Sequence, residues 1–357
     1  MKKIKKIWNR LNEKNIDAIL ITNPSNIFYL TDLRGACMGE REFLIIVSKN
    51  DFKIITSGIY QLEIKKRIPE GNFIIAERNS LFKEAIRILE KYKKIGFEKE
   101  DLKYGEYEYL KKYLKGKLIP NAGFVEDLRK IKDREEIERI KKAAKITDKT
   151  FYSILKIIKP GLTEKYIQRK IIEIMEDFGA EGVSFEPIVA SGKNSAEIHH
   201  QTSNKKIKNN EILLIDMGAR YKGYCSDFTR TVFIGRATQK IKKLYNLVLE
   251  TQERAIKNCK VNGEIKKLYE DAVLNFKKYK EDKYFTHSLG HGVGINIHEF
   301  PNLGSIDQGN FKNKMVFTIE PGLYHKNFGG IRIEDLCLMD KKCKILSKAT
   351  KKLIEIN

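Results

Sequence analysis

The chain has 357 residues, of which 41% are hydrophobic and 32% are charged, and its formal net charge is +22. This length favours two domains, because one domain usually spans roughly 100–200 residues. No apolar run approaches the roughly 18 residues that a membrane helix needs, so we expect a globular protein with no membrane partner.

The positive charge is spread along the whole chain, where lysines alternate with many isoleucines and asparagines. A concentrated basic patch would indicate nucleic acid as a partner. No basic motif with interleaved aromatic residues, as in RNA-binding modules, is present. We therefore interpret the lysines as solvated helix faces and expect no nucleic-acid partner.

The five cysteines are odd in number, and no two of them have C-x-x-C spacing. This pattern fits free thiols in a reducing cytoplasm better than disulfides or a zinc knuckle. The cysteines are Cys37, Cys225, Cys259, Cys337 and Cys343.

The first third of the chain alternates helices and strands. Residues 1–15 predict an amphipathic helix, since Ile4, Ile7, Trp8 and Leu11 recur at helix spacing. Short apolar segments bounded by turn residues predict strands at 16–22, 42–48 and 52–57, and helices are expected at 81–94 and 104–116. These elements indicate an α/β domain over residues 1–124.

The remaining residues, 125–357, indicate an α+β domain. Helices are expected at 133–158, which Pro160 and Gly161 end, and at 164–179. A hairpin, a helical stretch that includes residues 239–258, and a second hairpin follow, so that the expected order is helix, helix, hairpin, helix, helix, hairpin. The segments ILLIDMG and VFTIEPG resemble one another, so a weak internal repeat is expected. All six histidines lie beyond residue 198, which places the expected chemistry in this domain.

Each hairpin carries two carboxylates. Asp216 and Asp227 lie in ILLIDMGARYKGYCSDFTRT, whereas Glu320 and Glu334 lie in FTIEPGLYHKNFGGIRIEDL. The first pair is centred between Tyr221 and Lys222 and the second on Asn327. We therefore expect the members of each pair to lie opposite one another on neighbouring strands, about 5 Å apart. Carboxylates this close repel unless a cation holds them.

One histidine, His291, completes the predicted metal site. It lies in HSLGHGVG, where the glycines allow close backbone approach. A lone histidine there would usually be structural, but His287 and His298 are near it in sequence. Four carboxylates and one imidazole, without a thiolate, suit Mn²⁺, Co²⁺ or Zn²⁺. We expect two such ions, which together clamp a hydrolytic water.

Other residues near these motifs have competing interpretations. A pair such as His199 and His200 is most often surface loop. Arg332 shares a strand face with Glu334 and could be an ion-pair partner of the metal-site carboxylates or a substrate contact. Tyr324 could be a packing residue or a hydroxyl donor.

The chain resembles the pita-bread metallopeptidases, the superfamily of aminopeptidase P, prolidase, methionine aminopeptidase and creatinase. The resemblance rests on FEPIVASGKNSAEIHH, IDMGARYKGYCSDFTRT, HSLGHGVGINIHE, TIEPGLY and GIRIED, in that order. It covers nearly the whole chain and is closest to short microbial Xaa-Pro peptidases. It implies a creatinase-like α/β N-terminal domain, residues 1–124, and a pita-bread catalytic domain, residues 125–357.

The resemblance also implies roles for individual residues. Metal ligands would be Asp216, Asp227, His291, Glu320 and Glu334. Glu320, His199, His287 and His298 would be catalytic, and His199, His298, Tyr324 and Arg332 would contact substrate. The cofactor would be two divalent ions, with Mn²⁺ favoured over Co²⁺ and Zn²⁺, in a homodimer. The implied reaction is hydrolysis of the bond between an N-terminal residue and proline.

Two departures and two alternatives bear on this hypothesis. Ile198 stands where many relatives have proline before the first histidine, and Asn302 stands where some prolidases have arginine. The second departure predicts that the site accepts peptides longer than a dipeptide, because an arginine could hold a free carboxylate. The alternatives are methionine aminopeptidase activity and a non-catalytic binding protein of the same fold. Loss of metal ligands would mark the latter, and none is lost.

Overall fold

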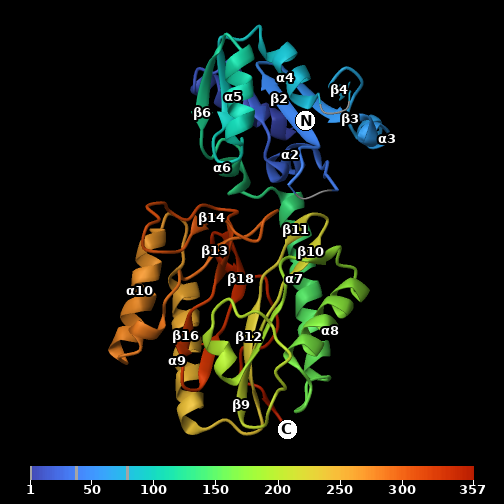
Figure 1. Cartoon of the computed structure of the whole chain (residues 1–357). Coiled ribbons are helices and arrows are strands. Elements are labelled where there is room, and N and C mark those ends of the chain that lie inside the picture. The colour runs from blue at the N-terminus through green and yellow to red at the C-terminus, as the bar shows by residue number, and fades with distance from the viewer. Residues whose placement is uncertain (1, 37–38, 78–79) are drawn as a thin grey trace. The chain divides into compact units, whose positions relative to one another are not determined.

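The computed structural model describes residues 2–36, 39–77 and 80–357. Contacts divide the chain into two compact units, Met1–Arg129 and Lys130–Asn357 (Figure 1). Helix α6 (Glu126–Arg129) belongs with the first unit by this criterion. The expected domain boundary after residue 124 stays a prediction. Cys37 lies outside the described residues.

The first unit contains a mixed six-stranded sheet in the order β4-β3-β2-β1-β5-β6. Helices α4 and α5 contribute to a hydrophobic core with Leu20, Leu44 and Ile46 of the sheet, and α1 and α2 contact β2. The helices are α1 (Lys2–Glu13), α2 (Pro24–Thr31), α3 (Gln61–Arg67), α4 (Leu81–Leu89) and α5 (Tyr104–Tyr113), with a short turn η1 (Gly58–Tyr60). The strands are β1 (Ala18–Ile21), β2 (Phe43–Ser48), β3 (Asp51–Ser57), β4 (Phe73–Ala76), β5 (Lys94–Glu98) and β6 (Lys117–Asn121).

The second unit begins with a helix pair that covers one sheet. Helices α7 and α8 share a hydrophobic core with β9 and β12, and this core includes Phe151, Ile171 and Leu213. Strands β20, β12, β9 and β8 form the sheet in that order, and β11, β10 and β7 form a smaller one. The elements are α7 (Arg134–Leu155), α8 (Glu164–Asp177), β7 (Gly182–Val183), β8 (Ile188–Ser191), η2 (Gly192–Ala196), β9 (Glu211–Asp216), β10 (Ala219–Tyr221), β11 (Tyr224–Cys225), β12 (Thr229–Ile234) and β20 (Glu355–Ile356).

A second helix pair follows, with its own sheet. Helices α9 and α10 share a core with β15 to β18 that includes Val248, Phe276 and Phe317. Strands β14, β13, β15, β18 and β19 form one sheet in that order, and β16 pairs with β17. The elements are α9 (Gln239–Asn258), α10 (Ile265–Lys278), η3 (Asp282–Tyr284), β13 (His291–Gly292), β14 (Glu299–Asn302), β15 (Val316–Ile319), β16 (Gly322–His325), β17 (Gly329–Arg332), β18 (Asp335–Asp340) and β19 (Lys342–Ile345).

The order of two helices followed by antiparallel strands therefore occurs twice in this unit, as the sequence predicted. The two halves meet through β17, which contacts β9 and β12. There the Thr231 hydroxyl accepts a hydrogen bond from the Arg332 backbone N–H, and the Thr229 carbonyl accepts one from the Glu334 N–H. Both expected carboxylate pairs are brought to this junction.

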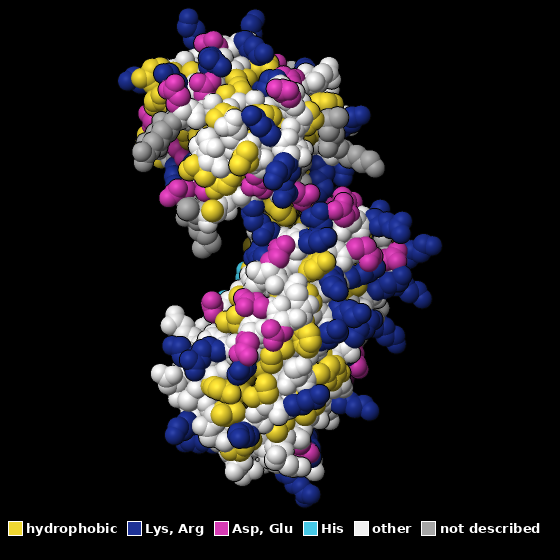
Figure 2. Space-filling model, turned by 90° about the vertical axis from the view of Figure 1, so that its right-hand side faces the viewer, with side chains coloured by type: hydrophobic (Ala, Val, Ile, Leu, Met, Phe, Trp, Pro, Cys, Tyr) yellow, Lys and Arg dark blue, Asp and Glu magenta, His cyan; other side chains and the backbone are white. Residues whose placement is uncertain are grey.

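The distribution of surface charge and the apolar character of the helices relate to the nucleic-acid and membrane partners considered from the sequence. On the face drawn in Figure 2, lysine and arginine side chains are dispersed among acidic and uncharged ones. Within the described ranges, no helix is both long and apolar enough to cross a membrane.

Candidate metal centre

The first hairpin places Asp216 and Asp227 on the same face, but not directly opposite one another. Asp216 pairs with Thr229, and Arg220 pairs with Cys225. The turn therefore lies at Lys222 and Gly223, which both have positive φ (45° and 80°), as a two-residue type I′ turn requires. The expected direct opposition was wrong by two residues along one strand, and the aspartates are diagonal neighbours.

The second hairpin agrees with the prediction. Ile319 pairs with Asp335, and Gly322 pairs with Arg332. The register that connects these two pairs places Glu320 opposite Glu334. Because Glu334 donates its N–H to the Thr229 carbonyl, the second carboxylate pair is held beside the first hairpin.

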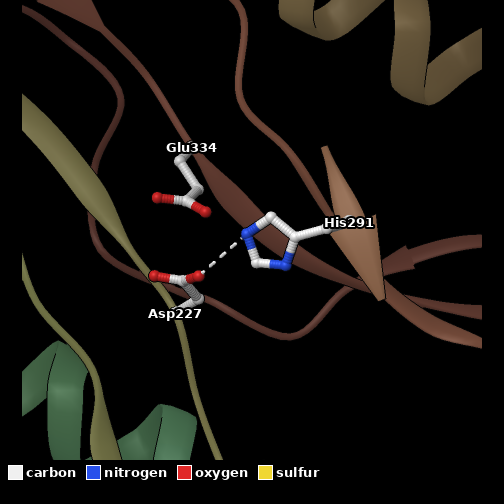
Figure 3. A group of neighbouring side chains, drawn as sticks. All are labelled: Asp227, His291 and Glu334. Atoms are coloured by element: carbon white, nitrogen blue, oxygen red, sulfur yellow. Dashed lines mark ion pairs between the residues drawn. The ribbon is translucent and has the colours of Figure 1, made fainter. Parts of the chain in front are cut away.

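His291 connects the two carboxylate pairs. Its Nε2 atom lies 3.4 Å from Asp227 Oδ2 and 3.3 Å from Glu320 Oε1. Its Nδ1 atom lies 3.2 Å from the Gly292 carbonyl, and a proton on Nδ1 would leave Nε2 as the ligand atom. Figure 3 shows Asp227, His291 and Glu334 pointing toward one another, and one ligand atom from each lies within 4.8 Å of the others.

Glycines around His291 permit this arrangement. A Cβ atom on Gly290 would lie 2.1 Å from the Thr318 carbonyl oxygen, and one on Gly292 would lie 2.3 Å from the Phe300 carbonyl oxygen. Neither position can accept a side chain without moving the backbone of the neighbouring strand. The glycines thus allow the close backbone approach that the sequence predicted.

The donor set fits a divalent cation. Asp216 Oδ1 and Glu334 Oε1 are buried and have no hydrogen-bond partner among the described residues. A buried carboxylate oxygen without a partner is costly unless a cation or a proton satisfies it. The two orphaned oxygens are therefore candidate ligand atoms, and an oxygen-rich set with one imidazole would suit hard or borderline divalent ions.

Burial and the closeness of the carboxylates also shift their pKa values. Burial raises the pKa of Asp227 well above its ordinary value, and the charges of Glu334 and Asp216 raise it further. Burial, and after it the charge of Glu320, raises the pKa of Glu334 well above its ordinary value. Burial opposes ionisation of Glu320 too, but the hydrogen bond and charge of His291 lower its pKa to about 2. Without a cation this cluster would take up protons at Asp227 and Glu334.

Arg332 and Tyr324 support the aspartate pair from one side. The buried Arg332 guanidinium lies 2.6 Å from Asp216 Oδ2, and it donates to the Tyr324 hydroxyl at 2.9 Å. His287 Nε2 lies 2.9 Å from the same hydroxyl, and its Nδ1 lies 2.7 Å from the Ser288 carbonyl. These partners favour the ion-pair role of Arg332 over a substrate contact. Tyr324 is a hydrogen-bonding residue rather than a packing residue.

Two threonines complete the centre, and the sequence analysis missed both. The Thr229 hydroxyl donates to Glu334 Oε2 at 2.7 Å and accepts from Arg332 Nε at 3.1 Å. The Thr318 hydroxyl donates to Glu320 Oε1 at 2.9 Å. Thr318 lies two residues before Glu320 and Thr229 two residues after Asp227, so each shares a strand face with a ligand. That spacing is the one signal that could have indicated them.

The accessory histidines lie near the centre with different exposure. The ring of His298 packs edge-on against that of His291, with centroids 4.3 Å apart, and its side chain is accessible to solvent. His199 is also exposed, and its charge lowers the pKa of both His287 and His298, after burial as the main cause. The three histidines therefore border one region beside His291.

A buried carboxylate, Glu164, holds the segment that carries His199. Its oxygens accept hydrogen bonds from the Ser191 N–H and the Ser203 hydroxyl, both at 2.7 Å. His200 Nε2 lies 3.1 Å away, so this histidine, expected on the surface, is buried against Glu164. Burial raises the pKa of Glu164, but the bonds from Ser203 and Ser191 outweigh this and hold it below its ordinary value.

We expect Glu164→Gln to lower the stability of the protein by about 2–4 kcal/mol, because a side-chain NH₂ would replace an acceptor that faces several donors. The melting temperature measured by calorimetry should fall by roughly 5–15 °C. Glu197→Gln is the matched control. Its carboxylate contacts His200 from the other side at 3.0 Å but is exposed, so its effect should stay within about 0.5 kcal/mol. Equal melting temperatures for the two variants would contradict this assignment.

Comparison with known proteins agrees with this geometry. The family model described as metallopeptidase family M24 matches residues 138–341, and the creatinase/prolidase N-terminal domain model matches residues 3–131. The chain belongs to metallopeptidase family M24. Both the resemblance inferred from the sequence and the expected two-part fold class are therefore confirmed, and membership of the family implies the use of divalent metal.

Individual M24 relatives match over the whole length of the chain. The Xaa-Pro dipeptidase of Pyrococcus horikoshii is 36% identical over 354 residues, which cover 99% of this chain and 98% of the relative. The structure of the Xaa-Pro dipeptidase from Bacillus anthracis has a TM-score of 0.93 at 33% identity, covering 100% of this chain and 99% of that one. The structure of the X-Pro aminopeptidase from Thermotoga maritima has a TM-score of 0.88 at 31% identity, covering 96% and 98%.

Proposed function

We propose that this M24 peptidase hydrolyses the peptide bond between an N-terminal residue and a proline that follows it. The observation that supports this most is the junction of two carboxylate pairs with His291, with two buried carboxylate oxygens left without partners. The names of the full-length relatives supply the substrate class. Proline has no backbone N–H, so a site that acts before proline must recognise its substrate in another way.

The proposed ligands of two divalent ions are Asp216, Asp227, His291, Glu320 and Glu334. Mn²⁺ is the favoured ion because most of the donors are carboxylate oxygens, with Co²⁺ or Zn²⁺ as alternatives. When bound, such ions activate water and stabilise the negative charge that develops on the carbonyl oxygen. Arg332 and Thr229 keep Asp216 and Glu334 oriented for this task.

Glu320 is the proposed proton carrier. Its side chain is about as accessible as that of Asp216, at 14% against 13%, whereas Asp227 and Glu334 are more deeply buried. It can therefore accept a proton from water and deliver it to the leaving imino nitrogen. The exposed His199 and His298, together with His287, would orient the carbonyl and the proline side of the substrate.

The experiment that tests this function compares Met-Pro with Met-Ala-Ser peptides on metal-loaded enzyme. We expect kcat/KM for the proline peptide to be larger by about 10²-fold or more, since the site is proposed to fit the proline ring. Comparable turnover of the two would support methionine aminopeptidase activity instead. No turnover of either, with metal retained, would support a non-catalytic binding protein.

Peptide length is a separate prediction, because the relatives have both dipeptidase and aminopeptidase names. Asn302 pairs with His291 across β14 and β13 and is exposed, so it borders the proposed site without a charge. We expect Ala-Pro-Ala to be cleaved at least as well as Ala-Pro. Asn302→Arg should shift kcat/KM toward the dipeptide, because an arginine can pair with its free carboxylate.

Asn302→Gln is the control for that substitution, since it adds length without charge and should leave the ratio of the two substrates unchanged. A large advantage for Ala-Pro in the unmodified enzyme would show that another residue binds the carboxylate.

We also propose a cytoplasmic location and a homodimer. Cys259, Cys337 and Cys343 are free thiols, which suits a reducing compartment. The dimer rests on the family resemblance alone.

A further inference from the structure

Three cysteines of the second unit lie together, away from the metal centre. Cys259 follows the last residue of α9, Cys337 lies in β18 and Cys343 lies in β19. The Cys343 thiol contacts the thiols of both other residues. Cys259 and Cys337 are buried, whereas Cys343 is partly accessible. Neither the proposed hydrolysis nor the sequence motifs give these thiols a role.

The backbone makes Cys259 and Cys343 neighbours. Lys260 and Lys342 form an antiparallel bridge, and Cys259 has an extended backbone, with φ −71° and ψ 116°. The register of this bridge places Cys259 opposite Cys343. Residues opposite one another on antiparallel strands have Cα atoms about 4.5–5.5 Å apart, which lies within the range that a disulfide spans.

Cys337 is less favourably placed as a partner. It pairs with Ile345, and Cys343 pairs with Met339. Cys337 and Cys343 are therefore diagonal neighbours, at the roughly 7–8 Å typical of such positions. A disulfide rarely spans more than about 7 Å between Cα atoms. Cys259 is thus the better disulfide partner for Cys343, and Cys337 is the less favoured alternative.

We propose that Cys343 and Cys259 form a reversible disulfide when the protein meets a hydroperoxide, with Cys343 as the attacking thiol. Its thiolate attacks one peroxide oxygen, the O–O bond breaks, and hydroxide leaves, which gives a sulfenic acid at Cys343. The Cys259 thiol then attacks that sulfur, the S–O bond breaks, and the oxygen leaves as water. In sum, two thiols lose two electrons and two protons, and one hydrogen peroxide becomes two water molecules.

The surroundings of Cys343 make it the reactive member. Hydrogen bonds from the Cys259 and Cys337 thiols lower its pKa to about 5, and the same contact raises the pKa of each of the other two. Burial and the charge of Asp335 oppose this shift, but the contacts with the two neighbouring thiols outweigh them. Cys343 is the partly accessible member of the group, whereas Cys259 and Cys337 are buried, so a peroxide would meet Cys343 first.

The disulfide would fasten the end of α9 to β19. The closed loop contains roughly 85 residues, a length for which a disulfide stabilises appreciably by constraining the unfolded chain. It encloses α10 and β13 to β18 and therefore His291, Glu320 and Glu334. We expect oxidation to raise the melting temperature of the full-length protein by about 5 °C or more.

The test treats the full-length protein with hydrogen peroxide, removes the peroxide with catalase, alkylates the remaining thiols and maps the peptides by mass spectrometry. We expect one peptide pair joined through Cys259 and Cys343, which dithiothreitol releases. Cys225→Ser is the matched control, because that buried thiol contacts the Ile295 carbonyl instead, and the joined pair should persist. Cys343→Ser should abolish both the joined pair and the rise in melting temperature.

Three results of the oxidation experiment would overturn the proposal. They are a sulfinic acid at Cys343 without cross-linking, a cross-link that joins two chains, and a pair joined mainly through Cys337. A further metal ion per chain that Cys343→Ser removes would also overturn it, in favour of a thiolate metal site. The peptide map of the unmodified protein decides the matter even if a variant fails to fold.

Discussion

Asp227→Asn is expected to lower kcat/KM for an Xaa-Pro peptide by at least about 10³-fold and to remove at least one metal ion per chain. Changes to groups that merely orient a ligand cost about 10–100-fold, and Asp227 is proposed to be a ligand itself. It lies 3.4 Å from His291 Nε2 and belongs to the group of three potential ligand atoms within 4.8 Å. Activity assays with metal analysis of the same preparation provide the measurement.

The melting temperature distinguishes loss of metal from loss of fold in the Asp227→Asn variant. Burial raises the pKa of Asp227 well above its ordinary value, so its charged form destabilises the metal-free protein. The metal-free variant should therefore melt no lower than the metal-free parent. Asp177→Asn, which removes an exposed carboxylate at the end of α8, should keep both activity and metal. Full activity of Asp227→Asn in the presence of a chelator would refute the assignment of this ligand.

Glu320→Gln is expected to lower kcat by about 10²–10⁴-fold, the range for loss of a general acid–base group, with a much smaller change in KM. Glutamine keeps an oxygen near His291 but cannot carry a proton. Steady-state kinetics, with metal analysis of the same preparation, would test this expectation.

Thr318→Val is the control for the Glu320 substitution. It removes the 2.9 Å hydrogen bond to Glu320 and the 3.0 Å bond that Thr318 accepts from the His291 N–H, but leaves both side chains, so kcat should fall by only about tenfold. A Glu320→Gln enzyme with near-normal kcat would show that another group carries the proton.

The register of the hairpins shows what sequence alone can and cannot determine. The centre of the second hairpin on Asn327 was predicted correctly, because the spacing of Glu320 and Glu334 matches the strand pairing. In the first hairpin the positive φ angles of Lys222 and Gly223 set the turn. Placing the turn midway between Asp216 and Asp227 therefore predicted a register that was wrong by two residues.

The predicted boundaries of helices and strands were wrong where the local composition was ambiguous. The helix expected at 81–94 ends at Leu89, and Lys94 begins β5. The segment KIGFE is too short for its pattern of apolar residues to separate a strand from the lysine-rich end of the preceding helix. By contrast, α9 extends over Gln239–Asn258, the residues predicted as helical, because its apolar positions keep a regular spacing over several turns.

The spacing of Thr229 and Thr318 from the acids could indicate a shared strand face, but the partners of the supporting residues could not be inferred from one sequence. The hydroxyl of Thr229 reaches Glu334, which is distant in the chain, and Glu164 binds Ser191 at the end of β8. Such contacts depend on how segments distant in the chain pack, whereas the proposed ligands stand out as acids within apolar strands.

The central claim is that two divalent ions at the five proposed ligands make this chain an Xaa-Pro peptidase. The most direct measurement is a titration of metal-stripped protein with Mn²⁺, in which bound ions and Ala-Pro hydrolysis are recorded together. We expect no hydrolysis without metal and full hydrolysis when two ions per chain are bound. Full hydrolysis by the stripped protein with chelator present, or saturation at two ions without any hydrolysis, would contradict the claim.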